Sequence, residues 1–217
     1  IKGGSLMKRA LKYIILALFI GSTTFAQGFK VSADGQQTFS FADKKGRNQA
    51  MFFSSTPLED VTGLSNDVKG SVTFDVGDVS TLKGSISITT ASLRTGIELR
   101  DGHLQSENWL DAESYPEITF VIKNVSNVKS LEDNKLEAKV IGDFTTHGVT
   151  KEVIAEVTMT YLDESEQTKK KAPGDLLGVE AKFSIVLSDY EVENMVLGQK
   201  VSDNIDITVT MVGSNAK

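Results

Sequence analysis

The sequence contains no cysteine and only two histidines among its 217 residues. Without thiols the chain forms no disulfide bond, thiolate metal site or cysteine nucleophile, and it carries no cysteine for lipid attachment. The histidines, His103 and His147, match neither an H-x-H nor an HExxH spacing, and a G-x-S-x-G nucleophile turn is missing as well. The common motifs of metal and nucleophile catalysis are therefore absent, and we predict no bound metal and no required cofactor.

Long apolar runs are also missing. The run Tyr13–Ile20 is less than half of the ~20 residues that a membrane-spanning helix needs. The basic residues Lys8, Arg9 and Lys12 precede it, and small residues follow it up to Ala26, which is typical of a secretory signal peptide. We expect residues 1–26 to comprise upstream residues and a cleaved signal peptide, which leaves no stable membrane span. The mature chain, 27–217, is then periplasmic or secreted.

Positive charge is scarce in the predicted mature chain. The signal segment removes four cationic residues (Lys2, Lys8, Arg9 and Lys12) and no acid, so the formal net charge changes from −6 to −10. Binding to phosphate backbones needs clustered Lys and Arg. An acidic chain therefore argues against nucleic acid as a partner, and it equally disfavours anionic lipid surfaces.

Alternation of apolar and polar residues dominates the rest of the chain and predicts antiparallel strands with one buried face. The expected strands lie at 37–41, 49–54, 71–76, 85–89, 118–123, 136–144, 153–161, 182–187 and 205–212. Short turns between them favour a closed barrel or a sandwich in one all-β domain over 27–217. The outward faces carry Ser, Thr, Lys, Glu and Asp, which is opposite to the pattern of an outer-membrane barrel. Residues 163–175 are polar throughout and predict a mobile hairpin loop.

One segment, 94–110, interrupts this alternation. Ile97, Leu104, Trp109 and Leu110 fall near helical spacing, and Gly102 can end or kink a turn. We expect a short helix pair here, inserted between two strands. With its apolar side facing inward, this segment would form a lid over one mouth of a barrel.

Two blocks of residues resemble the signature of the YceI-like family of secreted, lipocalin-like barrels. The first block is Ser92, Thr95, Gly96, Arg100, Asp101, His103, Leu104, Trp109, Leu110, Asp111, Tyr115, Pro116 and Phe120. The second is Gly142, Asp143, Phe144, Thr145, His147, Gly148, Val149 and Thr150, and a weaker match lies at Gly70, Val72, Phe74 and Asp75. The chain departs from the family at 52–57, which lacks a histidine, and at 187–191.

This resemblance implies an antiparallel, lipocalin-like β-barrel of about eight strands that binds a long apolar ligand and is not an enzyme. Such a protein sequesters or transports a polyisoprenoid, a polyprenyl quinone or a fatty-acyl compound inside the barrel. The resemblance alone also makes a homodimer plausible. The candidate ligand-binding residues are the inward apolar ones, Phe74, Ile86, Ile88, Ile97, Leu104, Trp109, Phe120, Phe144, Met159, Phe183 and Ile185.

Structural roles are expected for the polar motif residues Arg100, Asp101, His103, Tyr115, Pro116, His147 and Gly148. His103 is expected to bond a nearby Asp, and His147-Gly148 to form a tight turn. Two alternatives stay open at this point. The protein could be an enzyme that uses Asp101 and His103 as acid and base on a lipid-like substrate. It could also be a structural β-domain, because an eight-stranded barrel is just narrow enough to be filled by its own side chains.

Overall fold

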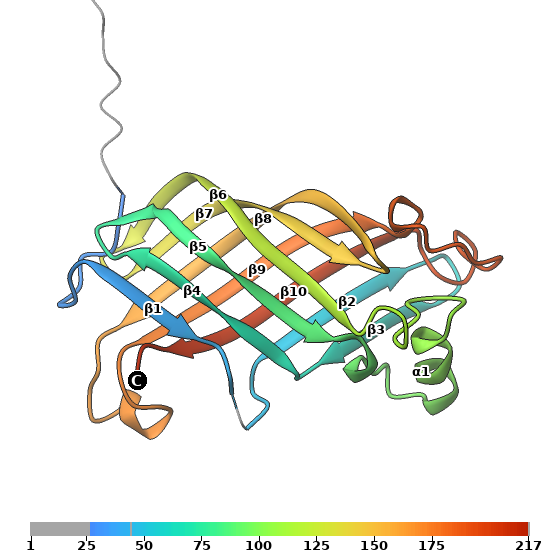
Figure 1. Ribbon diagram of the computed structural model, residues 1–217, viewed down its shortest axis with the longest axis horizontal. Coiled ribbons are helices and arrows are strands. Elements are labelled where there is room, and N and C mark those ends of the chain that lie inside the picture. The colour runs from blue at the N-terminus through green and yellow to red at the C-terminus, as the bar shows by residue number, and fades with distance from the viewer. Residues whose placement is uncertain (1–26, 44, 217) are drawn as a thin grey trace, which may run out of the picture.

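Ten strands, one α-helix and three short 3₁₀ helices make up the regular structure of the residues that the computed structural model describes, 27–43 and 45–216 (Figure 1). The predicted signal segment lies outside these residues. The α-helix is α1 (Glu98–Gln105). The 3₁₀ helices are Thr90–Ser92, Thr168–Lys170 and Leu187–Tyr190. The strands are β1 (Gln36–Ser40), β2 (Gln49–Ser55), β3 (Asp60–Ser65), β4 (Val68–Asp75), β5 (Asp78–Thr89), β6 (Glu117–Glu132), β7 (Lys135–Thr146), β8 (Val149–Leu162), β9 (Leu176–Val186) and β10 (Asn204–Ser214).

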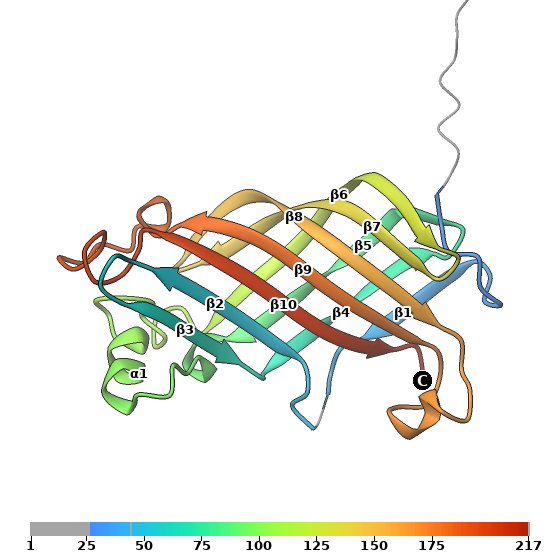
Figure 2. The same cartoon turned by 180° about the vertical axis from the view of Figure 1, so that it is seen from behind.

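All strand pairings in the sheet are antiparallel, and the sheet closes on itself. Its order is β1-β4-β5-β6-β7-β8-β9-β10-β2-β3, and β1 also pairs with β10 through Ser40 and Ser214. Both β1 and β2 therefore lie along β10, as Figure 2 shows for β2, and they are two segments of one interrupted strand. Likewise β3 continues into β4 after two residues. Strand β3 pairs with β2, and β4 pairs with β1. The ten segments thus form the eight-stranded antiparallel barrel that the sequence predicts.

Burial follows the alternation that the sequence shows. Along β7, Leu136, Ala138, Val140 and Phe144 are buried, whereas Glu137 is exposed and Lys139 forms an ion pair with Glu156 on the outer face. This pattern arises because successive side chains of a strand point to opposite faces. Strand β3 was not predicted, because its six residues, DVTGLS, are few and include Gly63. The expected helix pair is also wrong, since only α1 forms and turns follow it to residue 114.

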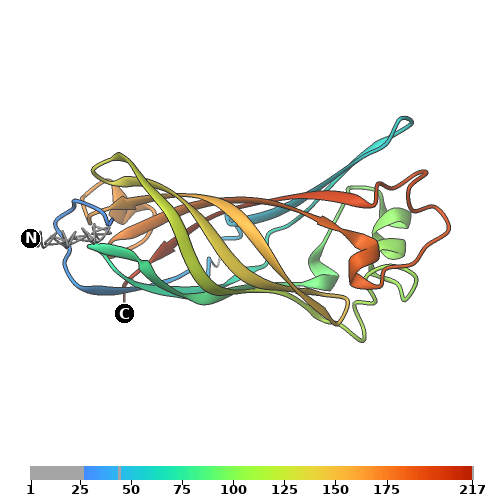
Figure 3. The same ribbon diagram turned by 90° about the horizontal axis from the view of Figure 1, so that it is seen from above.

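The end of the barrel opposite α1 is closed by aromatic side chains. Phe29, from the segment before β1, packs against Phe74 and Tyr161 with ring centroids 5.9 and 5.5 Å apart, and Phe39 contacts the same two rings. Phe39, Phe74 and Tyr161 are fully buried. We call these four residues the aromatic plug. Figure 3 shows α1 at one end of the barrel and both chain ends of the described region at the other.

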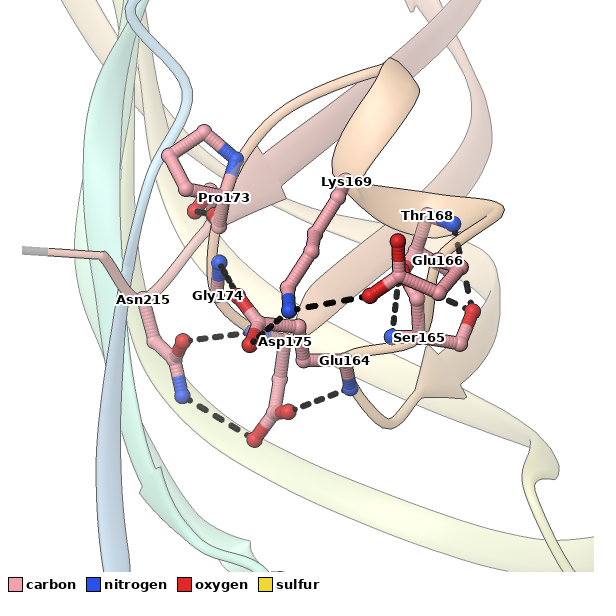
Figure 4. Close-up of polar contacts among 10 residues, drawn as sticks. Glu164, Ser165, Glu166, Thr168, Lys169, Pro173, Gly174, Asp175 and Asn215 are labelled. Atoms are coloured by element: carbon pink, nitrogen blue, oxygen red, sulfur yellow. Dashed lines mark hydrogen bonds and ion pairs between the residues drawn. The ribbon is translucent and has the colours of Figure 1, made fainter.

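The polar loop 163–175 lies at the plugged end and is tied to the barrel by hydrogen bonds (Figure 4). The Asp175 carboxylate accepts bonds from the Tyr161 hydroxyl at 2.7 Å, the Glu164 backbone N–H at 2.8 Å and the Asn215 amide at 3.2 Å. A short 3₁₀ turn, Thr168–Lys170, lies within this loop. Lys169 pairs there with the carboxylates of Glu164 and Glu166, at 3.5 and 3.4 Å. The loop therefore has a defined hydrogen-bonded conformation.

Candidate functional site

An apolar cavity occupies the barrel between the aromatic plug and α1. Its volume is about 200 Å³. Apart from Ser87, Thr119 and Thr146, every lining side chain is aliphatic, aromatic or a thioether. An apolar cavity of about 150 Å³ stays dry and is large enough to bind benzene. The barrel is therefore hollow along part of its length, and the filled core that the sequence left open is not what forms.

Small inward-facing residues help to leave this space. Ala50, Ala155 and Ala181 lie on three strands of the wall, and each lines the cavity. Larger side chains at these positions would extend toward the barrel axis. The interior of an eight-stranded barrel is only wide enough for its own side chains or for one small ligand. Inward alanines alone do not identify a hollow barrel, because Ala138 also faces inward but does not line the cavity.

Nine of the eleven residues predicted to bind the ligand line the cavity. They are Ile86, Ile88, Leu104, Trp109, Phe120, Phe144, Met159, Phe183 and Ile185. The other two do not. Phe74 is fully buried in the aromatic plug, and Ile97, which precedes α1, is 52% exposed to solvent. Contact of the nine with a ligand stays a prediction.

Some lining residues in irregular segments are not among the predicted ligand-binding residues. Leu93 and Leu110 flank α1, and Leu187 and Val201 lie in the segment between β9 and β10. Leu110 was expected on the inward side of the lid and Leu187 at the end of the predicted strand 182–187. No pattern marked Leu93 and Val201 as inward-facing, because the residues around them have no regular hydrophobic period. Tertiary structure brings both segments over the same mouth of the barrel, which we call the mouth end.

A hydrogen-bond network around Asp101 holds the lid in place. The carboxylate of Asp101, 8% exposed, accepts bonds from the backbone N–H and the hydroxyl of Thr95, both at 2.6 Å. Arg100 donates to the Thr95 hydroxyl at 2.9 Å and pairs with Glu59 of the β2–β3 turn at 2.7 Å. Bonds from Thr95, and secondarily the charges of Arg94 and Arg100, lower the pKa of Asp101 against the opposing effect of burial. Arg100 and Asp101 therefore connect α1 to the segment before it and to the β2–β3 turn, and their structural role stays a prediction.

His103 does not make the predicted hydrogen bond to an Asp. It is exposed, and Thr95 provides the hydrogen bonds to Asp101 instead. Residues two apart on a helix point to different faces, so the acid–base pair Asp101 and His103 has no supporting geometry. A lowered pKa also keeps the Asp101 carboxyl ionised, which is unsuited to a general acid near neutral pH.

The second motif block forms the predicted tight turn between β7 and β8. His147 and Gly148 both have positive φ, 49° and 74°. The His147 ring donates from Nδ1 to the Tyr190 carbonyl at 3.0 Å and packs edge-on against Tyr115, with ring centroids 5.0 Å apart. The backbone carbonyls of Tyr115 and Pro116 accept bonds from the Thr90 hydroxyl and N–H. The two blocks thus meet at the mouth end.

A polar cleft adjoins the cavity at this end. It is lined by Glu107, Asn108, Trp109, His147, Glu191 and Glu193. The half-buried Trp109 lines both the cleft and the apolar cavity, so the two adjoin at this residue. Among the described residues no cluster of three or more His, Asp or Glu is arranged to hold a metal ion. No helix of the described region is long and apolar enough to cross a membrane.

The family model for the YceI-like domain matches residues 36–213 of this chain. The chain belongs to the YceI-like family. It is 34% identical over 209 residues to a UPF0312 protein of Pseudomonas fluorescens and 30% identical over 209 residues to the protein YceI of Escherichia coli O157:H7. Each alignment covers 95% of this chain and 100% of the relative.

Solved YceI-like barrels have the same fold. BcnA of Burkholderia cenocepacia superposes with a TM-score of 0.61 at 20% identity, covering 76% of this chain and 96% of BcnA. A protein described as a polyisoprenoid-binding domain from Saccharophagus degradans, implicated in plant cell wall breakdown, superposes with a TM-score of 0.60 at 14% identity. That match covers 85% of this chain and 100% of the other protein. The eight-stranded lipocalin-like barrel is therefore the fold of this YceI-like chain.

Proposed function

We propose that this YceI-like protein binds one long apolar chain, such as a polyisoprenoid or a fatty-acyl chain, inside its barrel. The observation that carries this proposal is the cavity of about 200 Å³ with an almost entirely apolar wall. Ligand sites are usually concave and mostly apolar, with a few polar groups near one end. The structural neighbour from Saccharophagus degradans, described as polyisoprenoid-binding, supports the same ligand class.

Burial of the chain supplies the binding free energy. Each CH₂ group moved from water into the cavity contributes about 0.8 kcal/mol. Ordering the torsions of the chain and losing its free motion offset much of this gain. Affinity is then set by how many carbons fit between the aromatic plug and Trp109, and it requires no charged anchor on the protein.

The mouth end favours a ligand with an uncharged head group. Glu107, Glu191 and Glu193 line the cleft beside Trp109, through which a head group would project. Carboxylates repel a phosphate or carboxylate head across a few ångströms. A quinone or an alcohol carries no such charge. Among the candidate ligands we therefore favour a polyprenyl quinone or another neutral isoprenoid.

The physiological role in this proposal is sequestration or transport of the chain across an aqueous compartment after export. The signal pattern in residues 8–26 supports a periplasmic or secreted location. No chemistry is needed for such a role, because the protein only shields the chain from water. The homodimer that the resemblance suggested stays a prediction.

A cavity-filling substitution tests the binding site. Ala155→Phe places a ring in the cavity, whereas Ile154→Phe changes the neighbouring residue, which points outward and is 56% exposed. Each protein is purified, extracted with organic solvent and analysed by mass spectrometry, and Trp109 fluorescence is titrated with a long-chain isoprenoid quinone. We expect lipid and saturable binding in the wild type and in Ile154→Phe, and at least tenfold weaker binding in Ala155→Phe. If a folded Ala155→Phe binds as the wild type does, the barrel cavity is not the site.

A further inference from the structure

The three most exposed large apolar side chains of the described region, Met195, Leu58 and Leu99, lie at the mouth end. Met195, Leu58 and Leu99 are 93%, 86% and 71% exposed, and Ile97 is 52% exposed. Single exposed apolar residues are ordinary on a protein surface. Several of them around the opening of an apolar cavity are unusual, because such groups mark surfaces that contact a partner or a membrane.

Three separate segments contribute these side chains, and polar contacts hold the segments together. The β2–β3 turn, which contains Leu58, is linked to α1 by the ion pair of Glu59 with Arg100 at 2.7 Å. The segment before β10, which contains Met195, is linked to the turns after α1 by the bond from the Asn194 amide to the Asn108 carbonyl at 3.2 Å. Figure 1 shows α1, the β2–β3 turn and this segment at the same end of the barrel.

We propose that the mouth end docks on a lipid bilayer of low surface charge by inserting Leu58, Leu99 and Met195 between the head groups. This inference rests on the proposed function, because a long apolar ligand must move between a membrane and the cavity. The aromatic plug closes the opposite end, so the mouth end is the route that remains. Docking there lets a chain pass from the bilayer into the barrel without crossing water.

The charges near these side chains select the kind of bilayer. Glu98 lies beside Leu99 and Glu193 is two residues from Met195, whereas Glu59, beside Leu58, is paired with Arg100. Carboxylates in these positions are repelled by the negative potential of an anionic membrane. A zwitterionic surface imposes no such penalty, and insertion of apolar side chains then provides the attraction.

Vesicle flotation tests the docking surface with two matched triple variants. The first, Leu58→Ser/Leu99→Ser/Met195→Ser, removes the exposed apolar side chains of the mouth end. The second removes three exposed apolar side chains from the barrel wall and the plugged end, Leu131, Ile154 and Leu162. All proteins are expressed from the full sequence, so any effect of residues 1–26 is common to them.

With phosphatidylcholine vesicles we expect the wild type and the wall variant to float equally, and the mouth variant to partition at least tenfold less. Adding phosphatidylglycerol should reduce flotation of the wild type. Equal flotation of all three proteins, or binding only to anionic vesicles, would overturn the docking proposal. A third result would also overturn it: the wild type does not float but self-associates, and the mouth variant stays monomeric. That result would assign this surface to a second copy of the chain.

Extraction of bound lipid separates this proposal from the binding function. If the mouth variant retains extracted lipid but loses flotation, docking and ligand binding are distinct and both stand. If no protein yields lipid while flotation still depends on the mouth residues, the ligand proposal fails and the docking proposal stands.

Discussion

Replacing Asp101 by asparagine is expected to loosen the lid that covers the cavity. The Asp101 carboxylate accepts two bonds of 2.6 Å from Thr95, and Arg94 and Arg100 lie close enough to lower its pKa. Asparagine keeps one acceptor oxygen in the same place but removes the charge. The two bonds then change from charge-assisted to neutral.

The magnitude follows from these two bonds. A hydrogen bond to a charged group contributes about 1.5–3 kcal/mol and a neutral one about 0.5–1.5 kcal/mol. The substitution therefore costs about 1 kcal/mol per bond, or about 2 kcal/mol of lid stability. Since 1.4 kcal/mol corresponds to a factor of ten, the equilibrium for lid opening should rise about 30-fold.

Hydrogen exchange of the backbone amides in 94–110 measures lid opening directly. A suitable control is Glu98→Gln, which removes one negative charge from an exposed residue in the same first turn of α1. Amides of the lid should exchange about 30-fold faster in Asp101→Asn, whereas amides of β7 and β8 should not change. Equal acceleration in Glu98→Gln, or no acceleration in Asp101→Asn, would refute the role of the Thr95 bonds.

The contribution of Asp101 to lid stability should depend on pH with a definite sign. Because the pKa of Asp101 is lower in the folded protein, its contribution is fully present above about pH 4, the ordinary pKa of an aspartate. It is lost as the pH falls through the lower pKa of the folded state. The difference between wild type and Asp101→Asn should therefore be constant from pH 5 to 7 and diminish below pH 4.

Two further substitutions test the plugged end and the β7–β8 turn. Tyr161→Phe removes the 2.7 Å bond to Asp175 and should lower the free energy of unfolding at pH 7 by about 2 kcal/mol. Burial raises the pKa of Tyr161, so above about pH 10 the tyrosine ionises in the unfolded state and the wild type loses stability. The difference in free energy of unfolding between wild type and Tyr161→Phe should therefore narrow above about pH 10, and urea unfolding measures it. Gly148→Ala combines a positive φ of 74° with a Cβ only 2.5 Å from the Tyr115 ring, and should cost more than Gly96→Ala, where φ is 82° and the space is open. We expect Gly96→Ala to lower the free energy of unfolding by about 1–2 kcal/mol from backbone strain alone. If both variants lose the same stability in thermal unfolding, the Tyr115 contact is unimportant.

The barrel and its inward face could be predicted from the sequence because both depend on local alternation. Along β7 and β8 the residues expected inside, such as Val140 and Met159, are buried. The same pattern placed Phe74 on the inner face correctly but could not show that it belongs to the aromatic plug and not to the cavity. Position along the barrel axis depends on strand register, and alternation excludes one-residue shifts but not shifts by two residues.

The alternation of side chains and the two motif blocks determined, by sequence alone, the strand type, the family resemblance and the place of the lid. Only the tertiary structure decided that Ala50, Ala155 and Ala181 face a common space and leave it open. It also decided that Leu58, Leu99 and Met195, far apart in the chain, surround the same mouth. The physical reason is that a periodic pattern records which way a side chain points, whereas volume and neighbourhood arise only when distant strands and loops are packed together.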